Sequence, residues 1–130
     1  MEKLNEILRS SDLEYFGNGK HKINMENTMM LYKEKKIVVL DVRSQEEHDY
    51  VSFGFAKHIP LHELPDRLSE LSNDKLIVAF CTTANRSAMA FTYLSAMGYD
   101  ARILADSISG MAGYFKPGYV LKHHESDFKG

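Results

Sequence analysis

The sequence has few cysteines, little net charge and no long apolar run, and each of these absences excludes a class of protein. It has one cysteine, so no internal disulfide can form. Its 16 basic and 18 acidic residues nearly cancel to a net charge of −2, which excludes a broad basic surface for nucleic acid or anionic lipid. No run approaches the roughly 20 apolar residues of a membrane helix, and the first residues hold no apolar core of signal-peptide length. We therefore expect a soluble, cytoplasmic protein that binds neither nucleic acid nor membranes.

What remains is typical of one globular domain. The chain has 130 residues, of which 44% are hydrophobic and 26% charged, and this suits a single buried core. Gly17-Asn18-Gly19 interrupts the start of the chain, and the last residues are polar. We therefore divide the chain into an N-terminal extension over 1–20, a folded domain over 21–121 and a polar tail over 122–130.

Hydrophobic periodicity predicts strands that alternate with helices. Short apolar, β-branched runs predict strands, and apolar residues at helical spacing, with polar caps, predict helices. The predicted strands are 37–40, 58–60, 76–80 and 101–104. The predicted helices cover 4–8, 25–33 after Asn24, a short stretch from Ser44, 64–71, and 87–97 before Gly98. This order favours an α/β domain with a largely parallel sheet, in which active sites lie beyond the carboxyl ends of the strands.

Cys81 follows the predicted strand 76–80 directly and opens a polar loop that leads into a helix. A lone cysteine is usually a small buried apolar residue, but this position favours a thiolate. Backbone N–H groups at the start of a helix stabilise negative charge, and the Arg86 guanidinium can fold back to close the loop. We therefore predict a reactive cysteine with a lowered pKa. At least three N–H groups of residues 82–87 should point at its sulfur.

The histidines do not indicate a metal site. His58 and His62 are four residues apart, but Pro60 between them argues against one helical face. His123 and His124 are adjacent in the polar tail, which is weak evidence for metal binding. We assign no metal and no cofactor.

Several motifs, in order along the chain, resemble the rhodanese family. Asp41-Val42-Arg43-Ser44, continuing to Glu47, resembles the family's Asp-Val-Arg segment. His58-Ile59-Pro60-Leu61 resembles its next landmark, and Cys81 through Ser87 resembles its active-site loop. Gly98-Tyr99 and the late glycines Gly110 and Gly113 complete a likeness that extends over about residues 23–120.

The resemblance implies a five-stranded, mainly parallel sheet with helices on both faces, and sulfurtransferase chemistry. Cys81 would accept a sulfane sulfur as a persulfide and pass it to a thiol or cyanide. The substrate would lie against the loop residues Thr82, Thr83, Ala84, Asn85, Arg86 and Ser87. The donor would be thiosulfate or a persulfide, and the acceptor a thiol, with a thioredoxin-like protein among the candidates.

Two other functions stay open. One is a non-catalytic regulatory or binding module of the same family. The other is a small enzyme similar to phosphatases or arsenate reductases, which the resemblance disfavours because their loop is one residue longer than the span from Cys81 to Arg86.

Three further expectations concern single residues. Asp41 should bond loop backbone, and Arg43 should pair with Glu46 or Glu47. Ala84 stands where the family usually has glycine, so either Asn85 adopts a left-handed conformation or Ala84 does so under strain.

Overall fold

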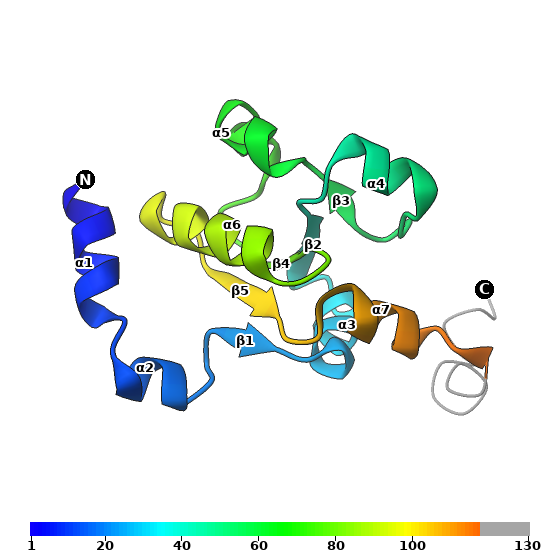
Figure 1. The fold of residues 1–130 in the computed structure, drawn as a ribbon, viewed down its shortest axis with the longest axis horizontal. Helices are drawn as coiled ribbons and strands as arrows, with labels where there is room; N and C mark the ends of the chain where they lie inside the picture. The colour runs from blue at the N-terminus through cyan, green and yellow to red at the C-terminus, as the bar shows by residue number, and fades with distance from the viewer. Residues whose placement is uncertain (118–130) are drawn as a thin grey trace.

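The structure is a computed structural model that describes residues 1–117. Its strands are β1 (Lys22–Ile23), β2 (Ile37–Asp41), β3 (Lys57–His58), β4 (Leu76–Phe80) and β5 (Ala101–Leu104). Its α-helices are α1 (Glu2–Ser10), α2 (Leu13–Gly17), α3 (Met25–Lys33), α4 (Gln45–Tyr50), α5 (Leu64–Arg67), α6 (Asn85–Ala96) and α7 (Ser107–Tyr114). Two 3-10 turns, η1 (Leu61–Glu63) and η2 (Leu68–Glu70), flank α5 (Figure 1).

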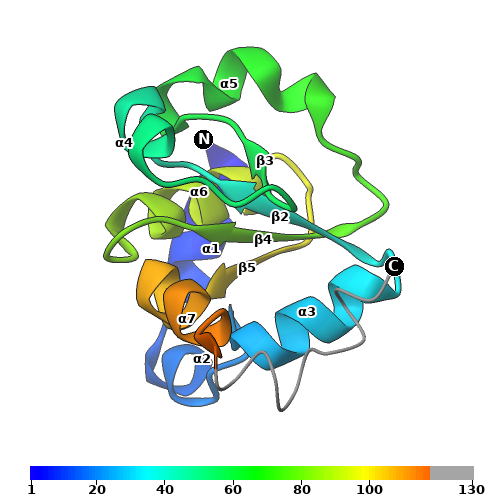
Figure 2. The same cartoon turned by 90° about the vertical axis from the view of Figure 1, so that its right-hand side faces the viewer.

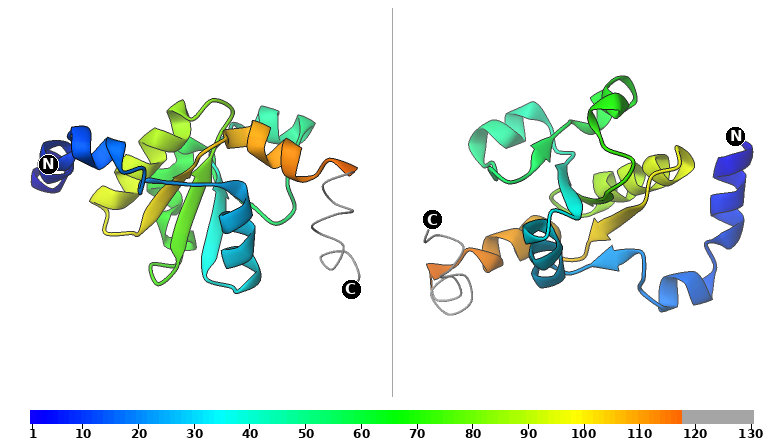
Figure 3. Two further views of the ribbon diagram at one scale, coloured as in Figure 1. Left: turned by 90° about the horizontal axis from the view of Figure 1, so that it is seen from below. Right: turned by 180° about the vertical axis from the view of Figure 1, so that it is seen from behind.

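The five strands form one sheet in the order β1-β5-β4-β2-β3, and all pairs are parallel. This confirms the predicted fold class. The longest pairing joins β2 to β4, with Ile37 opposite Leu76 and Asp41 opposite Phe80. Seen from below, the strands lie side by side with β4 near the middle (Figure 3). The carboxyl end of β4 is therefore enclosed by neighbours.

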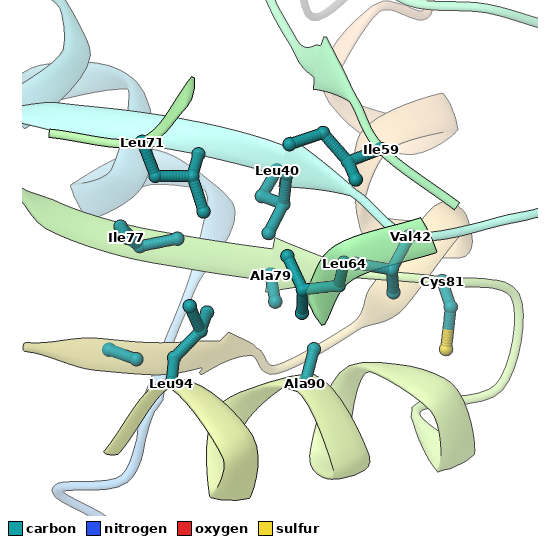
Figure 4. Packing of buried hydrophobic residues seen from close by; sticks show 11 residues of the cluster. Leu40, Val42, Ile59, Leu64, Leu71, Ile77, Ala79, Cys81, Ala90 and Leu94 are labelled. Carbon is teal, nitrogen blue, oxygen red and sulfur yellow. The ribbon is translucent and has the colours of Figure 1, made fainter. Parts of the chain in front are cut away.

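Helices cover both faces of the sheet, as expected (Figure 2). Because alternate residues of a strand point to opposite faces, β4 contributes to two separate cores. Ile77 and Ala79 pack with residues of α5 and α6, while Val78 and Phe80 pack with residues of α3 and α7. Figure 4 shows the first of these clusters, with Cys81 at its edge. The sheet is thus a rigid base for the loop that follows β4.

Helix-capping patterns located two helices correctly. Asn24 caps α3 by accepting a hydrogen bond from the Asn27 backbone N–H at 2.8 Å. Ser44 caps α4, and its capping box with Glu47 is complete. Gly98, with a φ of 89°, occupies the position after the C-cap of α6. Here local sequence chemistry was sufficient.

Several predicted boundaries were wrong. The strand expected at 58–60 is β3 at Lys57–His58, because Pro60 has no N–H to donate to a neighbouring strand. The helix expected over 64–71 is interrupted: Pro65 stands at its start, and Arg67, with φ −120° and ψ 14°, leaves helical geometry. Helix α6 begins at Asn85, two residues earlier than predicted.

The predicted extension, residues 1–20, contains two helices rather than one. Helix α1 contacts α6, and α2 ends at Gly17 (Figure 1). The division into extension, domain and tail stays a prediction, and the tail at 122–130 lies outside the described residues. Among residues 1–117, no helix combines the length and the apolar character required to cross a bilayer.

Candidate active site

The Cys81 sulfur lies at the carboxyl end of β4, inside the loop that leads to α6. The residue is 1% exposed and packs at the edge of the apolar cluster, and its side chain points toward the start of α6 (Figure 4). The Ser87 backbone N–H donates to Sγ at 3.3 Å. The thiol donates to the Ser87 hydroxyl at 3.5 Å, and that hydroxyl donates to the Ala84 carbonyl at 3.1 Å. Polar groups therefore surround one side of the sulfur, and aliphatic groups the other.

These contacts lower the pKa of the Cys81 thiol. Burial, the largest influence, raises it. The hydrogen bond with the Ser87 side chain and the backbone N–H groups of Ser87, Thr83 and Arg86 outweigh burial, so the pKa falls below its ordinary value. The Ser87 N–H is hydrogen-bonded to the sulfur, and the N–H groups of Thr83 and Arg86 also lower the pKa, which is the direction predicted from the sequence. The arrangement stabilises an anionic sulfur, as a thiolate or a persulfide.

The Arg86 guanidinium binds a carboxylate from another part of the chain. It forms a two-pronged ion pair with Glu47 of α4, at 2.5 Å and 2.9 Å. The Thr82 hydroxyl donates to the same carboxylate at 3.1 Å. Arg86 also reaches Thr82 Oγ1 at 3.4 Å, so its side chain does close the loop. The positive charge expected to face the cysteine is already neutralised.

Glu47 is the residue that sequence reasoning missed at this site. Its carboxylate accepts hydrogen bonds from Arg86, Thr82 and the Ser44 cap. The bond from Arg86 is the main reason why the pKa of the Glu47 carboxyl lies well below its ordinary range. Its capping-box position was visible in the sequence, but its contact with a residue 39 positions away was not.

The other loop residues differ in exposure. Thr82, Thr83 and Asn85 are exposed, Ala84 and Arg86 are half-buried, and Ser87 is fully buried. Ser87 is hydrogen-bonded to the Cys81 sulfur, and its predicted contact with a substrate stays a prediction.

Arg43 does not pair with Glu46 or Glu47, as the sequence suggested. It is 2% exposed and forms a two-pronged ion pair with Asp41, at 2.9 Å and 2.7 Å. The guanidinium also donates to the Val51 carbonyl at 2.7 Å and lies within 6 Å of two phenylalanine rings. Asp41 accepts from the Arg43 backbone N–H at 3.0 Å, which confirms its expected bond to loop backbone. Asp41 and Arg43 are only two residues apart, so the two side chains can pair with each other inside the protein.

Helix α7 borders the site from the other side. The Ile108 backbone N–H donates to the Cys81 carbonyl at 3.2 Å. Its neighbour Ser107 is buried and has a φ of 50°. The left-handed residue at the start of α7 is therefore Ser107 and not one of the late glycines, because Gly110 and Gly113 lie within the helix. A Cβ on Gly110 would stand 2.6 Å from the Asp106 side chain.

An open groove of about 490 Å³ lies beside the loop. Its walls are mostly apolar, with Val42, Pro60, Leu61 and Met89, and Arg86 is part of its lining. Ser44 and His62 complete the lining. We call it the loop groove. Val42 also packs in the same cluster as Cys81, so the groove approaches the sulfur from the β2 side.

Comparison with known proteins agrees with this geometry. A family model described as Rhodanese-like domain matches residues 26–113, more than half of the chain. The chain belongs to the rhodanese-like family. A rhodanese-related protein from Thermoplasma volcanium has a similar structure, with a TM-score of 0.62 and 31% identity, covering 75% of this chain and 95% of that one.

Curated relatives carry sulfur-transfer names. A tRNA sulfurtransferase from Mannheimia succiniciproducens is 34% identical over 73 residues, covering 52% of this rhodanese-like chain and 15% of the relative. A sulfurtransferase from Allochromatium vinosum is 32% identical over 63 residues, covering 48% of this chain and 59% of the relative. The matches thus span less than two thirds of each relative.

The rhodanese-like loop contains a strained alanine. Ala84 has φ 73° and ψ −10°, and Asn85 begins α6 with an ordinary conformation. Of the two alternatives drawn from the sequence, the strained alanine is the one that the structure contains. A left-handed alanine costs of order 1–2 kcal/mol. The shape of the loop requires this conformation, which explains why the family usually has glycine at this position.

Ala84→Gly is expected to stabilise the protein. Relief of the strain outweighs the extra freedom of the unfolded chain, which leaves a net gain of about 0.5–1 kcal/mol in the free energy of unfolding. Urea denaturation measures it. The control is Ala88→Gly inside α6, which should cost about 1 kcal/mol. A loss of stability in Ala84→Gly would contradict the strain.

Proposed function

We propose that this rhodanese-like protein carries and transfers sulfane sulfur through a persulfide on Cys81. The observation that supports the proposal most strongly is the polar environment of Sγ, which accepts a hydrogen bond from the Ser87 backbone N–H at 3.3 Å and lies 3.5 Å from the Ser87 hydroxyl. These groups favour an anionic sulfur at the position where the family has its active-site loop. The sulfur-transfer names of the relatives agree with it.

The chemistry needs no external oxidant or reductant. The Cys81 thiolate attacks the outer sulfur of a donor persulfide, the sulfur–sulfur bond of the donor breaks, and the donor leaves as a thiolate. Cys81 then carries the persulfide. An acceptor thiolate attacks the outer sulfur in turn, the Cys81 sulfur–sulfur bond breaks, and the Cys81 thiolate is regenerated. Because the loop stabilises that thiolate as leaving group, the same hydrogen bonds assist both steps.

Intact mass measurement tests the proposal. After incubation with glutathione persulfide and removal of excess donor, the protein should gain one sulfur atom. Treatment with cyanide should release that sulfur as thiocyanate and restore the original mass. Cys81→Ser, which removes the only cysteine, should show neither change. A wild-type protein that gains no sulfur would refute the proposal.

The burial of Cys81 also supports a second function, that of a non-catalytic binding or regulatory module. Cys81 is 1% exposed, so a substrate reaches the sulfur only if the atoms around it move. If they do not move, Cys81 cannot react, and the protein is a binding module. The mass measurement separates the two functions: a regulatory module stays unmodified while it remains folded.

Organic persulfides should be better donors than thiosulfate. Thiosulfate is a dianion, and the guanidinium at the loop is already paired with Glu47. The loop therefore offers hydrogen bonds but little net positive charge. We expect weak thiosulfate:cyanide activity and more efficient transfer from persulfides.

Glu47→Gln tests this electrostatic explanation. Glutamine keeps a capping-box side chain at α4 but removes the negative charge, so Arg86 becomes available to an anion. We expect the KM for thiosulfate to fall by about threefold or more, because an uncompensated charge near the surface acts at an effective dielectric constant of about 20. The low pKa of Glu47 keeps it ionised, so the difference should hold across pH 6–8 and shrink at high salt.

The control for this variant is Glu46→Gln. Glu46 is the exposed neighbour of Glu47, and its substitution changes the net charge equally. It should leave the KM for thiosulfate unchanged. A Glu47→Gln enzyme with an unchanged or higher KM would show that the ion pair does not limit thiosulfate binding.

A further inference from the structure

A second apolar groove lies between α1 and α6. Its lining consists of Leu4 from α1 and Ala88, Met89, Thr92, Tyr93 and Ala96 from α6. Its volume is about 430 Å³. We call it the helix groove. Its α6 wall lies within the family match at 26–113, but its α1 wall, with Leu4, lies outside that match.

The helix groove joins the loop groove at Met89. This side chain lines both grooves and is 63% exposed. Met89 and Arg86 are three residues apart and therefore share one side of α6. A molecule in the helix groove thus continues past Met89 to the loop that holds Cys81. The apolar surface is an extension of the candidate active site.

The residues that line the helix groove are all uncharged, and the charged residues of α1 pair with one another, Lys3 with Glu6 and Arg9 with Glu2. Helix α6 contains one charged residue, Arg86, and that residue is paired with Glu47. The uncharged lining of the helix groove therefore favours an uncharged, apolar partner. Methionine adapts its shape to different partners, which suits an exposed docking position. A single exposed methionine is ordinary on a protein surface. Met89 differs because it joins two apolar grooves beside the Cys81 loop, and this position indicates a binding surface.

The size of the two grooves favours a protein over a small molecule. Thiosulfate, cyanide or a small thiol fills only part of the loop groove and leaves the helix groove empty. A polypeptide segment that lies along α6 covers both. The stretch from Ala88 to Ala96 alone extends about 12 Å along the helix axis.

We propose that the helix groove is the docking surface for a protein that exchanges sulfur with Cys81 and presents its thiol on an apolar, uncharged segment. The inference rests on the proposed function, because the docked thiol is the donor or acceptor of the persulfide sulfur. The α1 helix is then a functional part of the protein, since it builds one wall of the groove.

The test compares a protein acceptor with a small one. The probes are reduced thioredoxin, whose active-site thiols lie on an apolar surface, and cyanide. Thr92→Glu places a negative charge in the helix groove at a half-buried position outside the Cys81 loop. It should lower kcat/KM for transfer to thioredoxin by about three- to tenfold, which corresponds to roughly 0.7–1.4 kcal/mol, and leave transfer to cyanide unchanged. Leu4→Glu, on the opposite wall, should act in the same direction.

The matched control is Met97→Glu. Met97 is 51% exposed just after α6 and belongs to neither groove. It should leave both activities unchanged. An equal loss with cyanide, no loss in Thr92→Glu, or the same loss in Met97→Glu would each overturn the proposal. So would a wild-type dimer in light scattering that Thr92→Glu dissociates without changing the preference between acceptors, because the groove would then bind a second copy.

A binding measurement separates this inference from the proposed function. Titration of thioredoxin into Cys81→Ser protein, with and without Thr92→Glu, reports docking without sulfur chemistry. If binding depends on Thr92 but the wild type never gains sulfur, the docking surface stands and the persulfide function fails. If sulfur is gained but binding ignores Thr92, the docking proposal fails alone.

Discussion

Asp41→Asn is expected to destabilise the protein by about 3–5 kcal/mol, because it leaves the buried Arg43 guanidinium without its counter-charge. Both side chains of the pair are at most 2% exposed. Asparagine can still accept the hydrogen bond from the Arg43 backbone N–H, so the variant isolates the loss of charge. Thermal unfolding should show a melting temperature lower by roughly 10–20 °C.

Two variants complete this measurement. Asp100→Asn disrupts the exposed pair with Arg102 and should cost less than about 1 kcal/mol. The double variant Asp41→Asn with Arg43→Met removes both charges and should recover part of the loss, since an apolar residue replaces an unpaired ion. A loss below about 1 kcal/mol in Asp41→Asn would show that the ion pair is not needed for stability.

Ser87→Ala is expected to raise the pKa of Cys81 by about one unit or more, because a hydrogen bond to a charged group contributes about 1.5–3 kcal/mol. The serine has one proton, and in the thiol form it points to the Ala84 carbonyl. When Cys81 ionises, the hydroxyl must turn to donate to the sulfur, and alanine cannot supply this bond.

The rate of alkylation by iodoacetamide against pH measures this effect. The wild-type midpoint should lie below about 8.5, the ordinary value for cysteine. In Ser87→Ala the midpoint should move up, and the rate near pH 7 should fall about tenfold, in proportion to the thiolate fraction. Ser95→Ala, a half-buried serine near the other end of α6, is the control. An unchanged midpoint in Ser87→Ala would assign the low pKa to the backbone N–H groups alone.

The low pKa of Cys81 also has a consequence for stability. The folded state holds the thiolate more readily than the unfolded chain does, so the contribution to stability is complete above the unfolded pKa. It is lost as the pH falls through the lower folded pKa. Comparison of wild type with Cys81→Ser between pH 6 and pH 9 shows this difference.

The sequence by itself determined the features that depend on neighbours along the chain. The apolar run Leu76–Phe80 gave the central strand β4, since a strand buried on both faces must be apolar throughout. The Ser44 capping box and Asn24 located α4 and α3 because a cap acts within three residues. The position of Cys81 between a strand and a helix predicted the loop, its N–H groups and the lowered pKa.

Only the tertiary structure decided which charges meet and which surfaces are joined. Glu47 reaches Arg86 from 39 residues away because parallel β2 and β4 place their carboxyl ends together. Arg43 pairs with Asp41 rather than with Glu47 because Arg43 and Asp41 are both buried. An unpaired guanidinium is most costly in the protein interior. Ala84 took the left-handed conformation because the loop must return its N–H groups toward one sulfur. The continuity of the two grooves through Met89 depends on how α1 and η1 pack around α6, and no local pattern encodes it.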